Sequence, residues 1–315
     1  MSIATETLSH RNRAIQGLEW LWQSVRTAPG PSLAGLIALS LVLFAFVVPL
    51  VISSSPFDPA NADLLNSLNP PFWSEGGSMV FPLGTDDQGR DLLTALAFGL
   101  RTSLIVGILS VIIGLVIGVS LGLISGFAGG AVDTIIMRAA DVQLAYPALL
   151  LAMIIDGAMR QALGTSRDTN TAIAIVVVSI GISFWVQYAR TIRASVLVER
   201  EQDYVAAARV TGRSRLAIIA LHILPNIMAP VLVIATINLA IAIITEATLS
   251  FLGIGIPLTQ PSLGTLIRNG NNFLQSGEWW IVAWPCAVLM LFVFSVNVFG
   301  DHLRDVFNPR LRTRR

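Results

Sequence analysis

Lysine is absent from the 315 residues of this chain, so all twenty of its basic side chains are arginines. Cysteine occurs once, at Cys286 within an apolar run, and the three histidines are far apart in the sequence. A P-loop needs a lysine on the phosphates and a Schiff base needs a lysine amine, so both are excluded. A single cysteine excludes internal disulfides, CxxC redox chemistry and multi-cysteine zinc sites. If ATP drives the work of this protein, another chain must hydrolyse it.

Charge is also scarce in this sequence. Charged residues make up 12% of the chain, which is about half the fraction that soluble domains carry. Hydrophobic residues make up 54%, and the mean hydropathy is +0.72. The chain is therefore an integral membrane protein, and its long uncharged runs predict an all-α fold of membrane-spanning helices.

Six uncharged runs predict six membrane-spanning helices, because about 20 apolar residues cross a bilayer core of about 30 Å. The runs are residues 32–53, 102–128, 142–155, 171–189, 226–245 and 279–300. The third run is short, so we expect its helix to begin in the interface, where Arg138 and Asp141 can pair at i,i+3. Residues 247–267 are uncharged too, but their glycines and prolines predict turns instead of a seventh helix.

The arginines predict the orientation of these helices. With the amino terminus inside, six spans put fifteen arginines on the inner side and five on the outer side. This bias follows the positive-inside rule, and a seventh helix would place the arginine-rich carboxyl end outside. We therefore expect both termini in the cytoplasm and an extracytoplasmic connector between the first two spans. Residues 1–30 suit either a short amphipathic segment on the membrane surface or a disordered tail.

Two local patterns predict how the second span begins and packs. Asp91 can cap a helix that follows it, and the aspartates before it favour a turn over a calcium loop, because their spacing is not that of an EF-hand. Further along, glycines recur every four residues and share one helix face, which lets another helix approach closely. The predicted packing face consists of Gly114, Gly118, Gly122 and Gly126.

Glu246 directly follows the fifth uncharged run. A carboxylate in or near the membrane is costly, and it is a candidate functional site for that reason. Two interpretations stay open from the sequence. Glu246 borders the outer end of a transport pathway, or its side chain hydrogen-bonds the turn-rich segment that follows.

A polar, arginine-bearing island, Asp203 to Asn226, separates two long apolar runs. Its alanines favour a helix, which Gly212 can end in the left-handed conformation. Ser214 can cap the next helix, and we expect Pro225 to break that helix where the apolar run begins. Small side chains leave the first helix with an accessible backbone, so another molecule can approach it closely.

This island resembles the EAA loop of the permease subunits of binding-protein-dependent ABC importers. The pattern of that loop is Glu-Ala-Ala, three residues, Gly, nine residues and Ile-x-Leu-Pro, and here Ala206 and His222 stand in place of Glu and Ile. In that family the loop docks into a cytoplasmic ATPase subunit, so the resemblance implies a coupling loop at residues 200–222. The coupling residues that it implies are Asp203, Tyr204, Ala207, Ala208, Gly212, Leu224 and Pro225.

Three further stretches resemble the second (C-type) permease subunit of the dipeptide/oligopeptide/nickel permease family. They are GTDDQGRD at 84–91, EATLSFLGIG at 246–255 and GDHLRDVFNPRLR at 300–312. The resemblance implies a type I importer permease fold in the inner membrane of a bacterium. Residues 1–97 would hold the cytoplasmic segment, the first span and the connector, residues 98–308 the permease domain, and residues 309–315 an arginine-rich cytoplasmic tail.

The same resemblance implies the partners of the chain. They are a paired homologous permease subunit, two cytoplasmic ATPase subunits that bind ATP and Mg, an extracytoplasmic solute-binding protein and membrane lipid, without nucleic acid. The chain itself would be non-catalytic and hold no cofactor or metal. Di- and oligopeptides are the first expectation for the substrate, and nickel chelates and glutathione stay open.

Two other classes compete with an importer permease. A membrane-embedded enzyme would need ionisable groups that converge inside the bilayer, where Glu246 is nearly alone. A channel is the third class, and nothing in a channel calls for the spacing of the coupling loop. Co-purification distinguishes these classes, because only an importer requires stoichiometric ATPase partners.

Overall fold

The structure, a computed structural model, describes residues 28–52, 56–58, 63–163, 169–257 and 260–307. Within these ranges the chain forms helices and no strand, which confirms the predicted all-α fold. Nearly all of residues 1–30, which the sequence left open between an amphipathic segment and a disordered tail, lie outside the described residues. The whole predicted tail at 309–315 lies outside them as well. The helices are α2 (Pro29–Val51), α3 (Leu92–Ala128), α4 (Gly130–Leu144), α5 (Ala148–Leu163), α6 (Thr169–Glu199), α7 (Asp203–Val210), α8 (Arg215–Ile218), α9 (Leu224–Phe251), α10 (Leu263–Asn271) and α11 (Trp280–Phe307).

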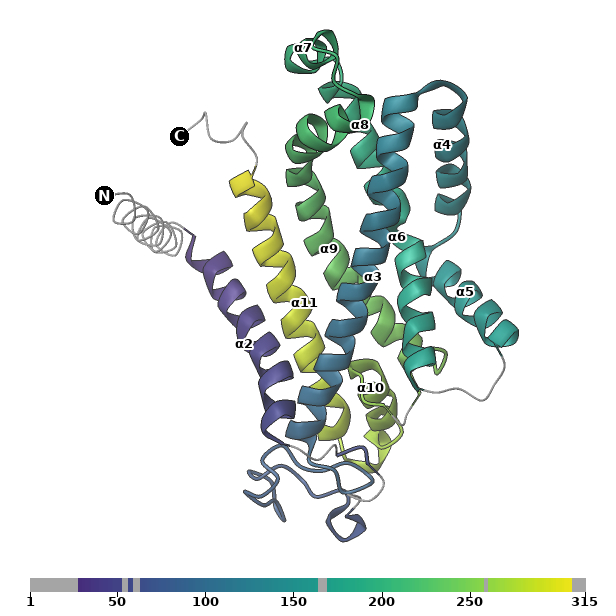
Figure 1. Ribbon diagram of the computed structural model, residues 1–315. Coiled ribbons are helices and arrows are strands. Elements are labelled where there is room, and N and C mark those ends of the chain that lie inside the picture. Colours follow the sequence, from purple (N-terminus) through teal and green to yellow (C-terminus); the bar gives the residue numbers. More distant parts are fainter. Residues whose placement is uncertain (1–27, 53–55, 59–62, 164–168, 258–259, 308–315) are drawn as a thin grey trace.

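Five helices are long and apolar enough to cross a membrane, namely α2, α3, α6, α9 and α11. The bent pair of α4 and α5 makes a sixth crossing when the two are counted as one span. Figure 1 shows the long helices side by side. The start of α2, the end of α11 and the α7–α8 region lie toward one end of the bundle, whereas α10 and the connector before α3 lie at the other.

The third span differs from the single helix that the sequence predicted. α4 and α5 meet at an angle of 95°. Pro147 accounts for the break, because its ring disfavours helical geometry at Tyr146 and removes a backbone donor. The expected pair of Arg138 with Asp141 is wrong as well, since Asp141 pairs with Arg190 of α6 at 2.5 Å.

The second span begins ten residues earlier than its uncharged run, because Asp91 caps α3 as predicted. Its carboxylate accepts the backbone N–H of Thr94 at 3.0 Å. The aspartates before it form the predicted turn. Asp86 accepts the N–H groups of Gln88 and Arg90 at 2.9 and 3.0 Å and pairs with the Arg90 guanidinium at 2.6 Å. This turn closes the connector against the start of α3.

The fifth span is longer than predicted. α9 continues past residue 245 to Phe251, so Glu246 lies inside the helix and not beyond its end. The turns expected at 247–267 begin only after Phe251. They lead into α10, whose nine residues are too few to cross a membrane.

Two apolar cores hold the bundle together. One joins α3, α6 and α9 through buried side chains such as Val106, Phe184 and Ile227. The other joins α2, α3, α9, α10 and α11 through side chains such as Leu100 and Phe292. α3 takes part in both cores, so its position fixes how the remaining spans are arranged.

Candidate coupling site

α7 ends in a turn that depends on a glycine. Gly212 has φ +75°, and the backbone N–H groups of Gly212 and Arg213 donate to the carbonyls of Arg209 and Ala208 at 3.0 and 3.1 Å. This is the bonding of a Schellman motif, in which a left-handed residue closes the helix. A Cβ added at Gly212 would meet no atom within 4 Å, so only the backbone conformation requires glycine there.

The chain then re-enters the bundle through α8. The Ser214 hydroxyl accepts the N–H of Ala217 at 3.3 Å and caps this helix. Pro225 does not break it, contrary to the expectation from the sequence. A π turn, Ile219–Ile223, carries the helix directly into α9, with the N–H of Leu224 bonded to the Ile219 carbonyl. Pro225 lies in the first turn of α9, and the widened turn before it accommodates the missing N–H.

Apolar side chains and alanines are exposed on α7 and α8 beside their charged residues. Val205 and Ala208 face inward and are buried, whereas Ala207 is exposed. Val210 and Leu216 are 90% and 79% exposed. Figure 1 shows α7 at the extremity of the bundle, beyond the ends of the long helices. Apolar side chains and alanines at such a tip are suited to contact another protein.

Tyr204 fastens α7 to the bundle. Its hydroxyl donates to Glu199 at the end of α6 and accepts from the Asn226 side chain at the start of α9, at 3.0 Å. The same Asn226 amide donates to the His222 carbonyl at 3.0 Å. Partial burial, and then the hydrogen bond to Glu199, raise the pKa of the Tyr204 phenol. The hydroxyl therefore stays protonated at neutral pH and links α6, α7 and α9. Asp203 is exposed beside it.

The four spaced glycines of α3 lie against the backbone of α6. A Cβ added at Gly118 would stand 2.4 Å from the Trp185 carbonyl oxygen, and one at Gly122 would stand 2.7 Å from that of Ala189. The corresponding distances are 3.0 Å at Gly114, to Gly181, and 3.1 Å at Gly126, to Arg193. Successive glycines thus meet α6 one turn apart along a continuous seam. The Arg200 guanidinium extends the seam by donating to the Gly126 carbonyl at 3.0 Å.

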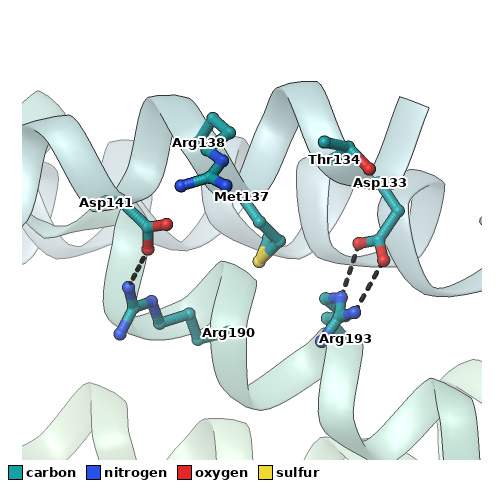
Figure 2. A pocket seen from close by; sticks show the side chains of 7 residues that line it. All are labelled: Asp133, Thr134, Met137, Arg138, Asp141, Arg190 and Arg193. Carbon is teal, nitrogen blue, oxygen red and sulfur yellow. Dashed lines mark hydrogen bonds and ion pairs between the residues drawn. The ribbon is translucent and has the colours of Figure 1, made fainter. Parts of the chain in front are cut away.

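Ion pairs attach α4 to the same helix. Figure 2 shows Arg190 and Arg193 of α6 reaching Asp141 and Asp133 of α4 around a hollow between the two helices. Arg193 binds Asp133 through two nitrogens, at 2.5 and 2.6 Å. Ser125 near the end of α3 also donates to Asp133. A bidentate pair of this kind fixes orientation as well as distance, so α3, α4 and α6 are joined at this level.

Glu246 lies in a buried hydrogen-bonded cluster. Its side chain is fully buried, and its carboxylate accepts the hydroxyls of Ser103 and Ser250 at 2.6 and 2.8 Å. Ser103 in turn accepts the N–H of Leu263 at 3.1 Å, and Ser250 accepts that of Ile256. Glu246 therefore joins α3, α9 and the start of α10. This geometry favours the second of the two interpretations, in which Glu246 bonds the turn-rich segment.

A further buried carboxylate escaped the sequence reasoning. Asp156 of α5 is fully buried and pairs with Arg160 of the same helix. Arg160 also donates to the carbonyls of Ile254 and Gly255, the latter at 2.8 Å. The i,i+4 spacing of Asp156 and Arg160 was the available signal. The pair fixes α5 to the turn after α9.

No three His, Cys, Asp or Glu side chains of the described residues gather as a metal site. Residues 114–313 match the family described as "Binding-protein-dependent transport system inner membrane component". The chain belongs to this permease family. It is accordingly an integral inner-membrane component of an ABC-type transport system, in a family of transport permeases.

Relatives in this family are similar over nearly the whole chain. The di/tripeptide transport system permease protein DppC of Pseudomonas aeruginosa (strain UCBPP-PA14) is 39% identical over 94% of this chain and 93% of its own. The dipeptide transport system permease protein DppC of Escherichia coli (strain K12) is 40% identical over 94% of both chains. A solved structure of the MetNI methionine ABC transporter in inward-facing conformations has a TM-score of 0.53. At 19% identity, covering 68% of this chain and 96% of that one, it shows a common fold alone.

In this permease the sequence-predicted residues occupy three places. The residues of the island gather at one end of the bundle, the glycines line the α3–α6 seam, and Glu246 lies near α10 toward the opposite end. The Tyr204 hydroxyl bonds the island to both α6 and α9. α7 is thus bonded to α6, which in turn packs on α3 along the glycine seam.

Proposed function

We propose that this permease pairs with a homologous subunit to form the membrane pathway of an ATP-driven importer for di- and oligopeptides. The relatives named as di/tripeptide and dipeptide permeases support this substrate class. An extracytoplasmic binding protein delivers the peptide, and two cytoplasmic ATPase subunits bind ATP and Mg. The chain itself is a non-catalytic subunit.

The observation that carries the mechanism is the position of α7. This short helix stands at the tip of the bundle with Val210 exposed, and Tyr204 ties it to α6 and α9. An ATPase surface that receives α7 moves those two spans when ATP closes the ATPase dimer. ATP can shift the complex between its two access states only because the ATPase–permease complex binds ATP more tightly in one state than in the other. The size of the shift equals that difference in binding free energy.

The arginine bias supports a cytoplasmic position for the α7 end. A labelling experiment tests this orientation in a Cys286→Ser background. Val210→Cys, at a position 90% exposed, should react only with reagents that enter the cytoplasm, and Leu65→Cys, at a position 97% exposed, should react from outside. Reaction of the residue-210 cysteine with an impermeant reagent in intact cells would reverse the orientation and remove the coupling assignment.

Transport is tested with the permease pair, ATPase subunits and binding protein reconstituted in proteoliposomes. We expect ATP-dependent uptake of labelled dipeptides and short oligopeptides. Uptake of a nickel chelate or glutathione, without peptide uptake, would contradict the peptide assignment while leaving the importer in place. Solute flux without ATP would favour a channel, and failure of ATPase subunits to co-purify would contradict the importer itself.

A further inference from the structure

A hollow of about 550 Å³ lies between the end of α3 and the α7–α8 region. Four arginines line it, namely Arg200, Arg209, Arg213 and Arg215, together with the single acid Glu201. The formal charge of the lining is therefore +3. Such an excess, drawn from three separate segments of the chain, attracts an anion.

The charges inside this hollow are not all neutralised by the protein. Arg200 pairs with Glu201 at 3.0 Å, and Arg209 donates to the backbone carbonyl of Arg200 at 3.4 Å. Among the described residues, the guanidinium groups of Arg213 and Arg215 form no hydrogen bond or ion pair. Two guanidiniums that face one hollow can each donate two N–H groups to a phosphate.

The length of α3 is consistent with the hollow lying at the depth of lipid headgroups. Its wall includes Phe127 and Ala128, the last two residues of α3. The uncharged run of α3 up to that point, residues 102–128, is about 40 Å long at 1.5 Å per residue. This matches a bilayer with its polar interfaces, about 40–45 Å. Phe127 and Ile218 also give the hollow an apolar wall, which a free soluble anion would not use.

We propose that this hollow binds the headgroup of an anionic phospholipid, with Arg213 and Arg215 on its phosphate. The glycerol and upper acyl chain lie against Phe127 and Ile218. Bound lipid would join the end of α3 to the segment between α7 and α8, and so set the resting position of α7. A protein partner fits the hollow less well, because the exposed apolar side chains Val210 and Leu216 are not part of its lining.

The test uses the complete importer, purified in detergent and titrated with phosphatidylglycerol or phosphatidylcholine. Native mass spectrometry measures lipid retained on the complex, and the temperature of heat-induced aggregation gives a second readout. We expect selective retention of phosphatidylglycerol and a rise in that temperature. The double variant Arg213→Gln/Arg215→Gln should weaken retention roughly 30-fold, from the usual contribution of two arginines near an anionic surface.

A matched double variant controls for charge alone. Arg138→Gln/Arg304→Gln removes the same charge from exposed positions outside the hollow and should retain phosphatidylglycerol nearly as well as the parent.

Equal loss in both double variants would overturn the proposal, as would equal retention of phosphatidylcholine. Protection by inorganic phosphate equal to that by lipid would assign the hollow to a soluble anion instead. If the Arg213/Arg215 variant loses its ATPase subunits while lipid retention on the permease pair is unchanged, the hollow belongs to a protein interface. Lipid retention does not depend on the transported solute, so this test can fail or succeed independently of the proposed function.

Discussion

Replacement of Gly118 by alanine tests the seam between α3 and α6 most directly. The added Cβ would stand 2.4 Å from the Trp185 carbonyl oxygen and 2.5 Å from the Tyr188 Cβ. Both atoms belong to or adjoin a helix backbone, so a rotamer change cannot relieve the contact. The helices must separate by 0.6 Å or more to bring 2.4 Å to 3.0 Å, the least distance that real Cβ atoms tolerate.

The expected cost follows from two opposing effects. Overpacking of this kind costs about 1–3 kcal/mol, and contact with rigid backbone puts it at the upper end. Alanine recovers up to about 1 kcal/mol through its higher helix propensity. The net loss should therefore be roughly 2 kcal/mol, and it should grow along the series from Gly114 to Gly118 as the closest contact shortens from 3.0 to 2.4 Å.

The assay heats the purified permease pair and measures the monodisperse fraction that survives, by size exclusion. Gly118→Ala should lower the midpoint by a few degrees and Gly114→Ala by less. Gly157→Ala is the matched control, because a Cβ at this helical glycine meets nothing within 4 Å. It should hold or slightly raise the midpoint. An unchanged midpoint for Gly118→Ala, or the same fall in all three variants, would refute the close-packed seam.

Three further predictions concern the other contacts. A glutamine at position 246, in the variant Glu246→Gln, can no longer accept both serine hydroxyls, so the substitution should cost about 1–3 kcal/mol of stability. Peptide uptake per folded complex and its pH dependence should not change. An altered pH profile of uptake would instead place the carboxylate in the transport pathway. Gly212→Val strains a left-handed position by more than about 1 kcal/mol, so hydrolysis should continue with less transport per ATP. Gly212→Asn, which tolerates φ +75°, should remain coupled, and normal transport per ATP in the valine variant would contradict the role of this turn. Asp133→Asn breaks the bidentate pair with Arg193 and should cost about 1–2 kcal/mol of stability. Asp141→Asn, in an exposed pair, should cost at most about 1 kcal/mol. Thermal midpoints that fail to rank in this order would refute the anchoring of α4.

Much of the fold could be predicted from the sequence because its signals are local. An uncharged run long enough to span lipid has few alternatives to a helix. The cap at Asp91 and the cap at Ser214 each act within three residues of their own position, at Thr94 and Ala217. The glycine repeat of α3 is local in the same sense, because a period of four defines one helix face whatever packs on it.

Other features required the complete fold. Asp141 was expected to pair within its own helix, but Arg190, 49 residues away, lies closer in space. Pro225 reads as a helix breaker in isolation, but the π turn before it lets the helix continue. The bend between α4 and α5 leaves a short uncharged run and Pro147 as its traces in the sequence, but neither gives the angle between the two helices.

Glu246 marks the boundary between these two kinds of information most sharply. The sequence by itself determined that a costly carboxylate lies at the edge of an apolar run, and it left two roles open. The tertiary structure brings Ser103, 143 residues away, within 2.6 Å of that carboxylate and buries it completely. A buried charge is tolerated only where fixed donors replace water. Because those donors come from α3 and α9, only the packed helices could decide which atoms surround it.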